Sequence, residues 1–280
     1  LNQDLTLDVD STIEHSEKLI QEGCHGVVLF GSTGMAQLIS TNEKKKLIGK
    51  LSDNKFKDNV MIGTGDNALN ENIDIMRHSI SNGINRFLIM PPAYYKYDDS
   101  DVINFYSKII EEVNDCKIIL YNFEKLSGYK FSPECIETLV EKFPDQIVGV
   151  KDSSYNLFET LKNNNFSIFP GSESKLLKGL ELGCDGIITA TTNITGTLAR
   201  EVYDGFKNNS DLSSNKKLCD VRGCFEKYNL ISGLHTVMSE KNQIFENLLP
   251  PLKLLDSNQK NEILTSLGNL EFEIANLKAA

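Results

Sequence analysis

Short apolar segments that alternate with amphipathic stretches are the feature that most constrains the fold of this chain. Each apolar segment has four or five residues, and the stretches between them repeat apolar side chains at helical spacing. This order is typical of a parallel sheet whose strands are joined by crossover helices. The segments expected to be strands are GVVLF (26–30), VMIG (60–63), RFLIM (86–90), KIILY (117–121), IVGVK (147–151), SIFP (167–170) and GIITA (186–190).

The connecting stretches predict helices, several of which begin at capping residues such as Ser11, Thr41 and Ser132, the last followed by Pro133. After residue 195 no strand pattern follows, and 215–235, 240–249 and 258–277 are typical of helices. Between the strands we expect helices at 12–22, 41–52, 71–82, 100–114, 133–143, 155–163 and 174–182.

Seven strands are one fewer than a (β/α)8 barrel contains, the common architecture for a chain of 280 residues. The alternating segment LTLDV (5–9) is one candidate for the missing strand, although Asp8 and Asp10 suit the N-terminus of a helix better. The hypothesis that we favour places the first strand upstream of Leu1. We therefore expect an α/β fold, with a (β/α)8 TIM barrel over residues 1–207 and a C-terminal helical extension over 208–280.

An open doubly wound sheet is the alternative architecture. Its glycine-rich fingerprint is missing, because GSTG (31–34) does not match GxGxxG, and GxxxxGK[ST] occurs nowhere. The sequence therefore predicts no mononucleotide site.

Composition excludes several classes of protein. With 40% hydrophobic and 24% charged residues the chain is ordinary for a soluble globular protein, and a net charge of -10 argues against binding nucleic acid. No segment approaches the roughly 20 apolar residues of a membrane span, and no signal-peptide pattern opens the chain. The six cysteines are scattered without a CxxC pair. We expect a soluble, cytoplasmic protein with reduced thiols and no metal or cofactor.

The carboxyl ends of the predicted strands supply the candidate site residues, because these ends converge on the active site of a barrel. Hydroxyls, phenols and one lysine dominate there, with no histidine cluster and no paired carboxylates. The residues are Ser32 and Thr33, Pro91, Pro92, Tyr94 and Tyr95, Tyr121 and Asn122, Lys151, Asp152 and Ser153, Gly171, Ser172 and Glu173, and Thr189 to Thr192.

Lys151 ends the apolar segment IVGVK, which has the pattern of a strand buried on both faces. A lysine amine held away from water can attack a ketone and form an imine, which is an electron sink for making or breaking a carbon–carbon bond. Tyr121 would relay protons, while Ser32 and Thr33 would hold a carboxylate. A lysine at a strand end is most often a solvated charge, so it is the joint placement of these residues that favours Schiff-base chemistry.

Each of these features also has a purely structural interpretation. Tyr121 could end a strand with its ring in the core. The segment PPAYYKY (91–97) could be a surface loop or an oligomer contact, because exposed aromatic residues often mark interfaces. The GSTG segment could be a turn whose glycines supply positive φ.

The motifs resemble those of the dihydrodipicolinate synthase / N-acetylneuraminate lyase family of class I aldolases. They occur in the order and spacing of that family over nearly the whole chain. The matching motifs are GSTG (31–34), PPAYY (91–95), YN with SG (121–122 and 127–128), GVKDSS (149–154), PGSE (170–173) and DGIITATTN (185–193).

The resemblance implies a (β/α)8 barrel with added C-terminal helices, assembled as a homotetramer that is a dimer of dimers. It implies that Lys151 forms the imine with pyruvate or a pyruvate-derived ketoacid and that Tyr121 relays protons. Ser153, close after the lysine, is a further substrate-binding candidate. The turn that holds the carboxylate consists of Gly31, Ser32, Thr33 and Gly34.

The resemblance also assigns residues outside this centre. Tyr94 matches the tyrosine that family members insert into a neighbouring subunit's site, with Tyr95 as the second choice. The backbone carbonyl of Ile188 would line the pocket. Gly171 and Glu173 would contact the distal part of the substrate.

Departures from the family pattern bear on the substrate. Leu126 stands where dihydrodipicolinate synthases carry an arginine for a substrate carboxylate, and we expect none of Arg77, Arg86, Arg200 and Arg222 near a strand's carboxyl end. YNFEKLSG (121–128) and GLHTV (233–237) resemble the sialic acid lyase branch instead. The other departures are Met35 for an acidic residue, Glu124 for a proline, and Ser174 and Ala190 at positions that contact the glycerol tail in the lyases.

The sequence therefore predicts a lyase: a metal-independent, Schiff-base aldolase that uses pyruvate and acts on a 2-keto-3-deoxy sugar acid. Dihydrodipicolinate synthase, which condenses pyruvate with aspartate semialdehyde, is the main alternative. A barrel that binds a ketoacid or sugar without turnover is the second. We expect a small-molecule substrate and a homotetramer, with no nucleic-acid or membrane partner.

Overall fold

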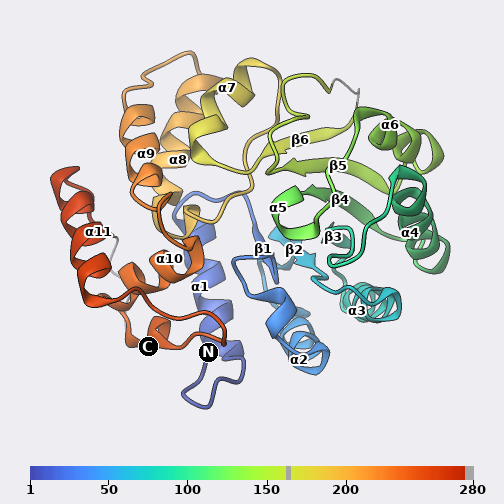
Figure 1. Cartoon of the computed structure of the whole chain (residues 1–280), viewed down its shortest axis with the longest axis horizontal. Coiled ribbons are helices and arrows are strands. Elements are labelled where there is room, and N and C mark those ends of the chain that lie inside the picture. The colour runs from blue at the N-terminus through green and yellow to red at the C-terminus, as the bar shows by residue number, and fades with distance from the viewer. Residues whose placement is uncertain (162–164, 275–280) are drawn as a thin grey trace. The chain divides into compact units, whose positions relative to one another are not determined.

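A parallel sheet of six strands organises residues 27–170 of the chain in the computed structural model, which describes residues 1–161 and 165–274. The strands follow one another in the sheet from β1 to β6 in chain order, and every neighbouring pair is parallel (Figure 1). This confirms the first six predicted strands and the α/β class. The strands are β1 (Val27–Leu29), β2 (Val60–Gly63), β3 (Arg86–Ile89), β4 (Lys117–Asn122), β5 (Ile147–Asp152) and β6 (Ser167–Pro170).

The seventh predicted strand, 186–190, is not a strand in the structure. The segment does lie alongside β6, since the Asp185 N–H donates to the Ile168 carbonyl (3.1 Å) and the Ile188 N–H donates to the Pro170 carbonyl (3.3 Å). The two donor residues are three positions apart in the sequence, whereas the two acceptor residues are two positions apart. Gly186, between the donors, has a φ of 155°. The extra residue and the positive φ interrupt the regular ladder.

The helices α2, α3, α4 and α6 lie side by side along the outside of the sheet (Figure 1). Their ends are fixed by capping: Ser40 and Glu43 form a capping box on α2, and the Ser132 hydroxyl accepts from the Cys135 N–H on α6. The helices and helical turns around the sheet are η1 (Ala36–Leu38), α2 (Thr41–Leu51), η2 (Lys57–Asn59), α3 (Leu69–Ser81), α4 (Asp99–Glu112), α5 (Glu124–Ser127) and α6 (Pro133–Lys142).

Two predicted helix starts and one predicted helix are wrong. The N-caps of α1 and α2 are Asp8 and Ser40 rather than Ser11 and Thr41, because their side chains reach the N–H groups of the first turn. The part of the predicted helix 155–163 that the structure describes, 155–161, is irregular. The N–H groups of Tyr155, Leu157 and Phe158 donate to the Asp152 carboxylate, so they are not available for the bonds of a regular helix. Residues 162 and 163 lie outside the described range.

The N-terminal segment 5–9 is not a strand, because α1 begins at Val9 with Asp8 as its cap. A first strand upstream of Leu1 stays a prediction.

The chain divides into two compact units, one of which contains the sheet and comprises residues 26–171 and 178–188. The other comprises 1–25, 172–177 and 189–280. Residues on both sides of the predicted boundary at 207 and 208 fall within this second unit, and a separate C-terminal domain stays a prediction. The remaining elements are α1 (Val9–Gln21), η3 (Glu173–Lys175), α7 (Leu176–Glu181), α8 (Thr192–Lys207), α9 (Ser214–Gly223), α10 (Leu230–Ser239), η4 (Gln243–Glu246) and α11 (Ser257–Asn269).

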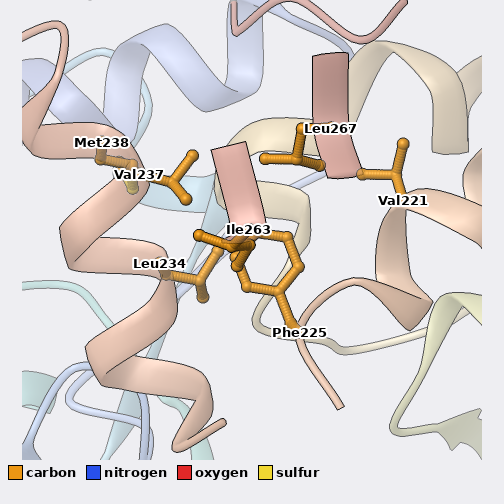
Figure 2. Packing of buried hydrophobic residues seen from close by; sticks show 7 residues of the cluster. All are labelled: Val221, Phe225, Leu234, Val237, Met238, Ile263 and Leu267. Atoms are coloured by element: carbon orange, nitrogen blue, oxygen red, sulfur yellow. The ribbon is translucent and has the colours of Figure 1, made fainter. Parts of the chain in front are cut away.

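An apolar cluster holds the last helices of the second unit together. Phe225, directly after α9, packs with Leu234 of α10 and Ile263 of α11, and none of the three is more than 1% exposed (Figure 2). Burying a side chain of this size contributes about 1.5–3 kcal/mol. Within the described residues after 195 the structure has helices and turns and no strand. The predicted helix 215–235 is two helices, and 240–249 forms only a short turn, η4. The predicted helix 258–277 corresponds to α11, which ends at Asn269, and residues 275–277 lie outside the described range.

The six cysteines are free thiols. Burial raises the pKa of Cys24, Cys135 and Cys184 to about 11 and that of Cys116 to about 12, which keeps these thiols protonated and poorly nucleophilic at neutral pH. In the described part of the chain, no helix has both the length and the apolar character that crossing a membrane requires.

Candidate active site

Lys151 lies near the carboxyl end of β5, where it pairs in register with Tyr121 of β4 and Phe169 of β6. Its side chain is largely buried, with 8% of the residue exposed. The Nζ atom lies over the Tyr121 ring, 4.1 Å from the centroid. Residues in register on parallel strands point to the same face, so this contact follows from the sheet itself.

Tyr121 connects Lys151 to the turn after β1. Its hydroxyl lies 3.1 Å from the Ser32 Oγ, and either group can donate. The ring is 4% exposed and packs with Leu88 and Ile119 in an apolar cluster of the sheet unit. Because apolar contacts fix the Tyr121 ring and the Ser32 hydroxyl pairs with its phenol, Tyr121 can transfer a proton beside the Lys151 amine without moving.

The GSTG turn is held by backbone bonds from the Met35 N–H to the Ser32 carbonyl (3.1 Å) and from the Ala36 N–H to the Gly31 carbonyl (3.4 Å). Positive φ occurs at Phe30 (59°) and Met35 (53°), which flank the turn, and not at its glycines. The alternative interpretation, in which the glycines supply positive φ, is therefore wrong. A Cβ on Gly34 would lie 3.3 Å from the Phe30 N atom, so the close approach of the backbone favours glycine there.

Thr33 belongs to this turn, but its side chain has no hydrogen bond among those described. Phe30 and Met35 are not glycines, so their left-handed backbone conformation costs free energy, about 1–3 kcal/mol each. Such strain is common where a turn presents groups to a ligand. The backbone of this turn is therefore typical of a ligand-binding loop.

Tyr94 and Tyr95 project outward instead of joining this centre. They are 89% and 74% exposed, and their rings meet edge to face at 5.1 Å. Tyr94 has a φ of 86°, and the preceding Ala93 N–H donates to the Asn67 side chain at 2.8 Å. The sequence brings both tyrosines to the surface of the sheet unit, held by an anchored loop.

Ser153 directly follows β5, and Gly171 directly follows β6. The Ile188 N–H donates to the carbonyl of Pro170, the last residue of β6 (3.3 Å). The Gly171 N–H donates to the Asp152 carbonyl at 2.9 Å, and a Cβ on Gly171 would lie 2.2 Å from the Ser153 Oγ. The Ile188 side chain packs against the cluster that contains Tyr121. Only glycine therefore fits at position 171 while Ser153 keeps its place.

Glu173 lies in the other compact unit, where its carboxylate is fully buried. The hydroxyls of Thr189 (2.8 Å), Thr191 (3.1 Å) and Thr195 (3.3 Å) donate to it, and the Arg222 Nε lies 3.5 Å away. Burial raises the pKa of the Glu173 carboxyl, and the hydroxyls and Arg222 only partly offset this effect.

Arg222 corrects one expectation from the sequence. Its Nε also donates to the Ser172 Oγ (3.3 Å), and Ser172 follows the end of β6 by two residues. One arginine therefore does lie close to a strand's carboxyl end. A long side chain on α9 reaches back across 50 residues of sequence, which spacing along the chain cannot reveal.

Asn122 and Asp152 were assigned no role from the sequence, yet both are fully buried and hydrogen bonded to each other (2.8 Å). The available signal was that a polar residue directly follows both Tyr121 and Lys151 in strands that are otherwise apolar. Among the residues that the structure describes, no group of three or more His, Cys, Asp or Glu side chains is placed to hold a metal ion.

Comparison with known proteins supports the family suggested by the motifs. The profile of the Dihydrodipicolinate synthetase family matches residues 1–269, so the chain belongs to this family. A 2-dehydro-3-deoxy-D-gluconate/2-dehydro-3-deoxy-phosphogluconate aldolase of Picrophilus torridus is 29% identical over 82% of this chain and 89% of its own. A 4-hydroxy-tetrahydrodipicolinate synthase of Methanothrix thermoacetophila is 29% identical over 72% of this chain and 70% of its own.

Solved structures share the fold. A prophage protein of the dihydrodipicolinic acid synthase family from Escherichia coli K12, in complex with pyruvate, has a TM-score of 0.85 at 22% identity, covering 98% of this chain and 96% of its own. Dihydrodipicolinate synthase from Agrobacterium tumefaciens has a TM-score of 0.87 at 22% identity, covering 96% of both chains.

Proposed function

We propose that this protein is a lyase, a class I aldolase that forms a Schiff base between Lys151 and pyruvate or a pyruvate-derived 2-oxo acid. The observation that supports this most is the contact of the buried Lys151 amine with the Tyr121 ring, together with the 3.1 Å pairing of Tyr121 with Ser32. Burial limits the solvation of the amine, and a hydroxyl pair beside it supplies the proton transfers that imine chemistry needs.

Cleavage begins when Lys151 Nζ adds to the C2 carbonyl of the 2-oxo acid and water leaves, which gives an iminium. Tyr121, hydrogen bonded to Ser32, gives its proton to the hydroxyl that leaves as this water, and the resulting phenolate then takes the proton of the C4 hydroxyl. The C3–C4 bond breaks, an aldehyde leaves, and the electron pair moves into the iminium to form an enamine. A proton returned to C3 and a water molecule then release pyruvate and free Lys151, and condensation is the reverse sequence.

A 2-keto-3-deoxy sugar acid is the substrate that we favour. Leu126 in α5, directly after β4, offers an apolar side chain that is 44% exposed. In the same unit, Arg86 begins β3 and pairs with Lys117 at the start of β4, the opposite end from Lys151. Arg77 pairs with Glu112. Neither of these arginines replaces the guanidinium that a second substrate carboxylate would need. Arg222, which lies close to the end of β6, is already engaged by the Glu173 carboxylate at 3.5 Å.

The Picrophilus relative, named as an aldolase of two such sugar acids, supports the same choice. Dihydrodipicolinate synthase, also called 4-hydroxy-tetrahydrodipicolinate synthase, is the alternative, and relatives with the second name support it. Non-catalytic binding of a ketoacid or sugar is the second alternative.

We also propose that the sheet closes into a (β/α)8 barrel, that the protein is cytoplasmic, and that it assembles as a homotetramer. The bonds from Asp185 and Ile188 to β6 support a further sheet position there. The exposed Tyr94 and Tyr95 support an interface, since aromatic residues are enriched in such contacts. Light scattering tests the assembly, and a strict monomer would argue against a role for Tyr94 in a neighbouring subunit.

Borohydride reduction in the presence of pyruvate, followed by peptide mass mapping, tests the imine. We expect a pyruvate adduct on the peptide that contains Lys151 and none in Lys151→Arg. The peptide that contains Lys44, a lysine of the same unit that is 1% exposed, serves as an internal control and should stay unmodified. Absence of the adduct at Lys151 would contradict the enzyme, whereas a positive result leads to a substrate panel of 2-keto-3-deoxy acids against aspartate semialdehyde.

A further inference from the structure

Asp152, at the end of β5, carries a fully buried carboxylate that accepts four N–H donors. Its Oδ1 accepts from the Asn122 Nδ2 (2.8 Å) and the Tyr155 N–H (2.9 Å). Its Oδ2 accepts from the Leu157 N–H (2.8 Å) and the Phe158 N–H (3.0 Å). These donors cannot reverse their role, so the site requires a side chain that presents an accepting oxygen on each side.

Asn122, at the end of β4, extends this network to two loops. Its Nδ2 also donates to the Asn156 Oδ1 (2.8 Å), and its Oδ1 accepts from the Phe131 N–H (3.2 Å). The Asn156 Nδ2 in turn donates to the Phe131 carbonyl (3.0 Å). Two buried side chains therefore tie the ends of β4 and β5 to the loops that follow them.

The network lies one residue away from the two groups that would carry the chemistry. Tyr121 is in register with Lys151, and Asn122 is in register with Asp152. Successive residues of a strand point to opposite faces, so Asn122 and Asp152 brace the strand ends from the face opposite to the amine and the phenol. Any slip or splaying of β4 against β5 would change the 4.1 Å contact between Lys151 and Tyr121.

We propose that Asp152 and Asn122 are positioning residues, whose hydrogen bond across the strand ends holds Lys151 and Tyr121 in the geometry needed for imine formation. This inference rests on the proposed function. Because both side chains point to the face opposite to Lys151 and Tyr121, we expect their loss to lower the rate of imine formation and to leave the binding of pyruvate nearly unchanged. Catalytic rates are sensitive to displacements of the reacting groups by about 1 Å, so loss of the hydrogen bond between Asn122 and Asp152 should affect the rate.

The test measures how fast cyanoborohydride traps the pyruvate adduct at Lys151, well below each variant's thermal midpoint, as a function of pyruvate concentration. We expect Asp152→Asn to lower the trapping rate at least about tenfold while half-saturating pyruvate changes less than about twofold. Asn122→Ala, which keeps the three backbone donors on Asp152, should lower the rate by a smaller factor of about three or more. If Asp152→Asn does not fold, the trapping rate of Asn122→Ala alone tests the positioning role.

Asp99→Asn is the matched control. The Asp99 carboxylate accepts from the hydroxyls of Tyr129 and Ser132 in the same unit, and no hydrogen bond among the described residues joins it to Asp152 or Asn122. We expect this variant to lose thermal stability but to trap pyruvate at the wild-type rate. Wild-type trapping in a folded Asn122→Ala variant, or an equal loss in Asp99→Asn, would overturn the positioning role. If the wild-type protein itself forms no adduct, the proposed function fails and the inference fails with it.

Discussion

The two buried carboxylates, Asp152 in the sheet unit and Glu173 in the other unit, are satisfied in different ways. Both are fully buried. Asp152 accepts four N–H groups, whereas Glu173 accepts three threonine hydroxyls and lies beside Arg222. An N–H group can only donate, but a hydroxyl can turn and accept. The first site therefore requires accepting oxygens on both sides, whereas the hydroxyls of the second site can adapt to a group that donates.

Replacing each carboxylate by its amide should reveal this difference most strongly at Asp152. Asp152→Asn places an NH2 group against N–H donors that cannot reorient, and leaving them unpaired should cost roughly 3 kcal/mol of unfolding free energy. Urea denaturation of the variant beside the wild-type protein measures this. A cost below that of the amide substitution at Glu173 would contradict the comparison.

Glu173→Gln should cost less, about 1 kcal/mol at neutral pH, because the threonine hydroxyls can turn to accept from the new NH2 group. The same denaturation experiment measures it. Glu173→Gln would cost more than Asp152→Asn if the Arg222 guanidinium needed the full negative charge of Glu173. Combining Arg222→Met with Glu173→Gln would reveal this coupling as a non-additive change in the free energy of unfolding.

The pH dependence sharpens the contrast further. The folded pKa of Glu173 is raised, so its contribution to stability is fully present below the unfolded value of about 4.5 and is lost as pH rises through the folded value. The stability of the wild-type protein relative to Glu173→Gln should therefore fall as pH rises above about 4.5. Thermal midpoints of both proteins between pH 4.5 and 8 test this, and parallel curves would contradict it.

Two half-buried histidines in the same unit should act with the opposite sign. His15 bonds to the Asn193 side chain (2.8 Å) and His235 to the Phe245 carbonyl (2.9 Å), each satisfied as a neutral ring that donates. Burial lowers the pKa of both, so their contribution is present above about 6.5 and is lost as pH falls through the folded value. The variant His15→Gln/His235→Asn, which keeps both donors, should flatten the loss of stability between pH 7 and 5. An unchanged slope would exclude the histidines as its source.

The smallest effect is expected for Thr195→Val, which removes one hydroxyl from Glu173 and keeps the shape of the side chain. The bond is long, 3.3 Å, and two other threonines still donate to the carboxylate, so the cost should be below about 1 kcal/mol. Thr189→Val, at a bond of 2.8 Å, should cost more. Equal effects in chemical denaturation would mean that the donors compensate for one another.

Local patterns were reliable where burial and helix periodicity dominate. The runs VMIG and SIFP match β2 and β6 residue for residue, and Pro133 after Ser132 located the start of α6. The prediction for 155–163 failed because a side chain from β5 takes the N–H groups that a helix would use. The prediction for 186–190 failed because Gly186 adopts a positive φ, which apolar composition does not reveal.

The sequence by itself determined the α/β class, the order of the strands and the presence of Lys151, Tyr121 and Ser32 at strand ends, because period and composition are local properties. Only the tertiary structure decided which of these groups meet. It placed Lys151 over Tyr121 through strand register, brought Arg222 to Ser172 across 50 residues, and buried Asn122 against Asp152. Contacts of this kind depend on how elements distant in sequence pack, and no short stretch of the chain encodes them alone.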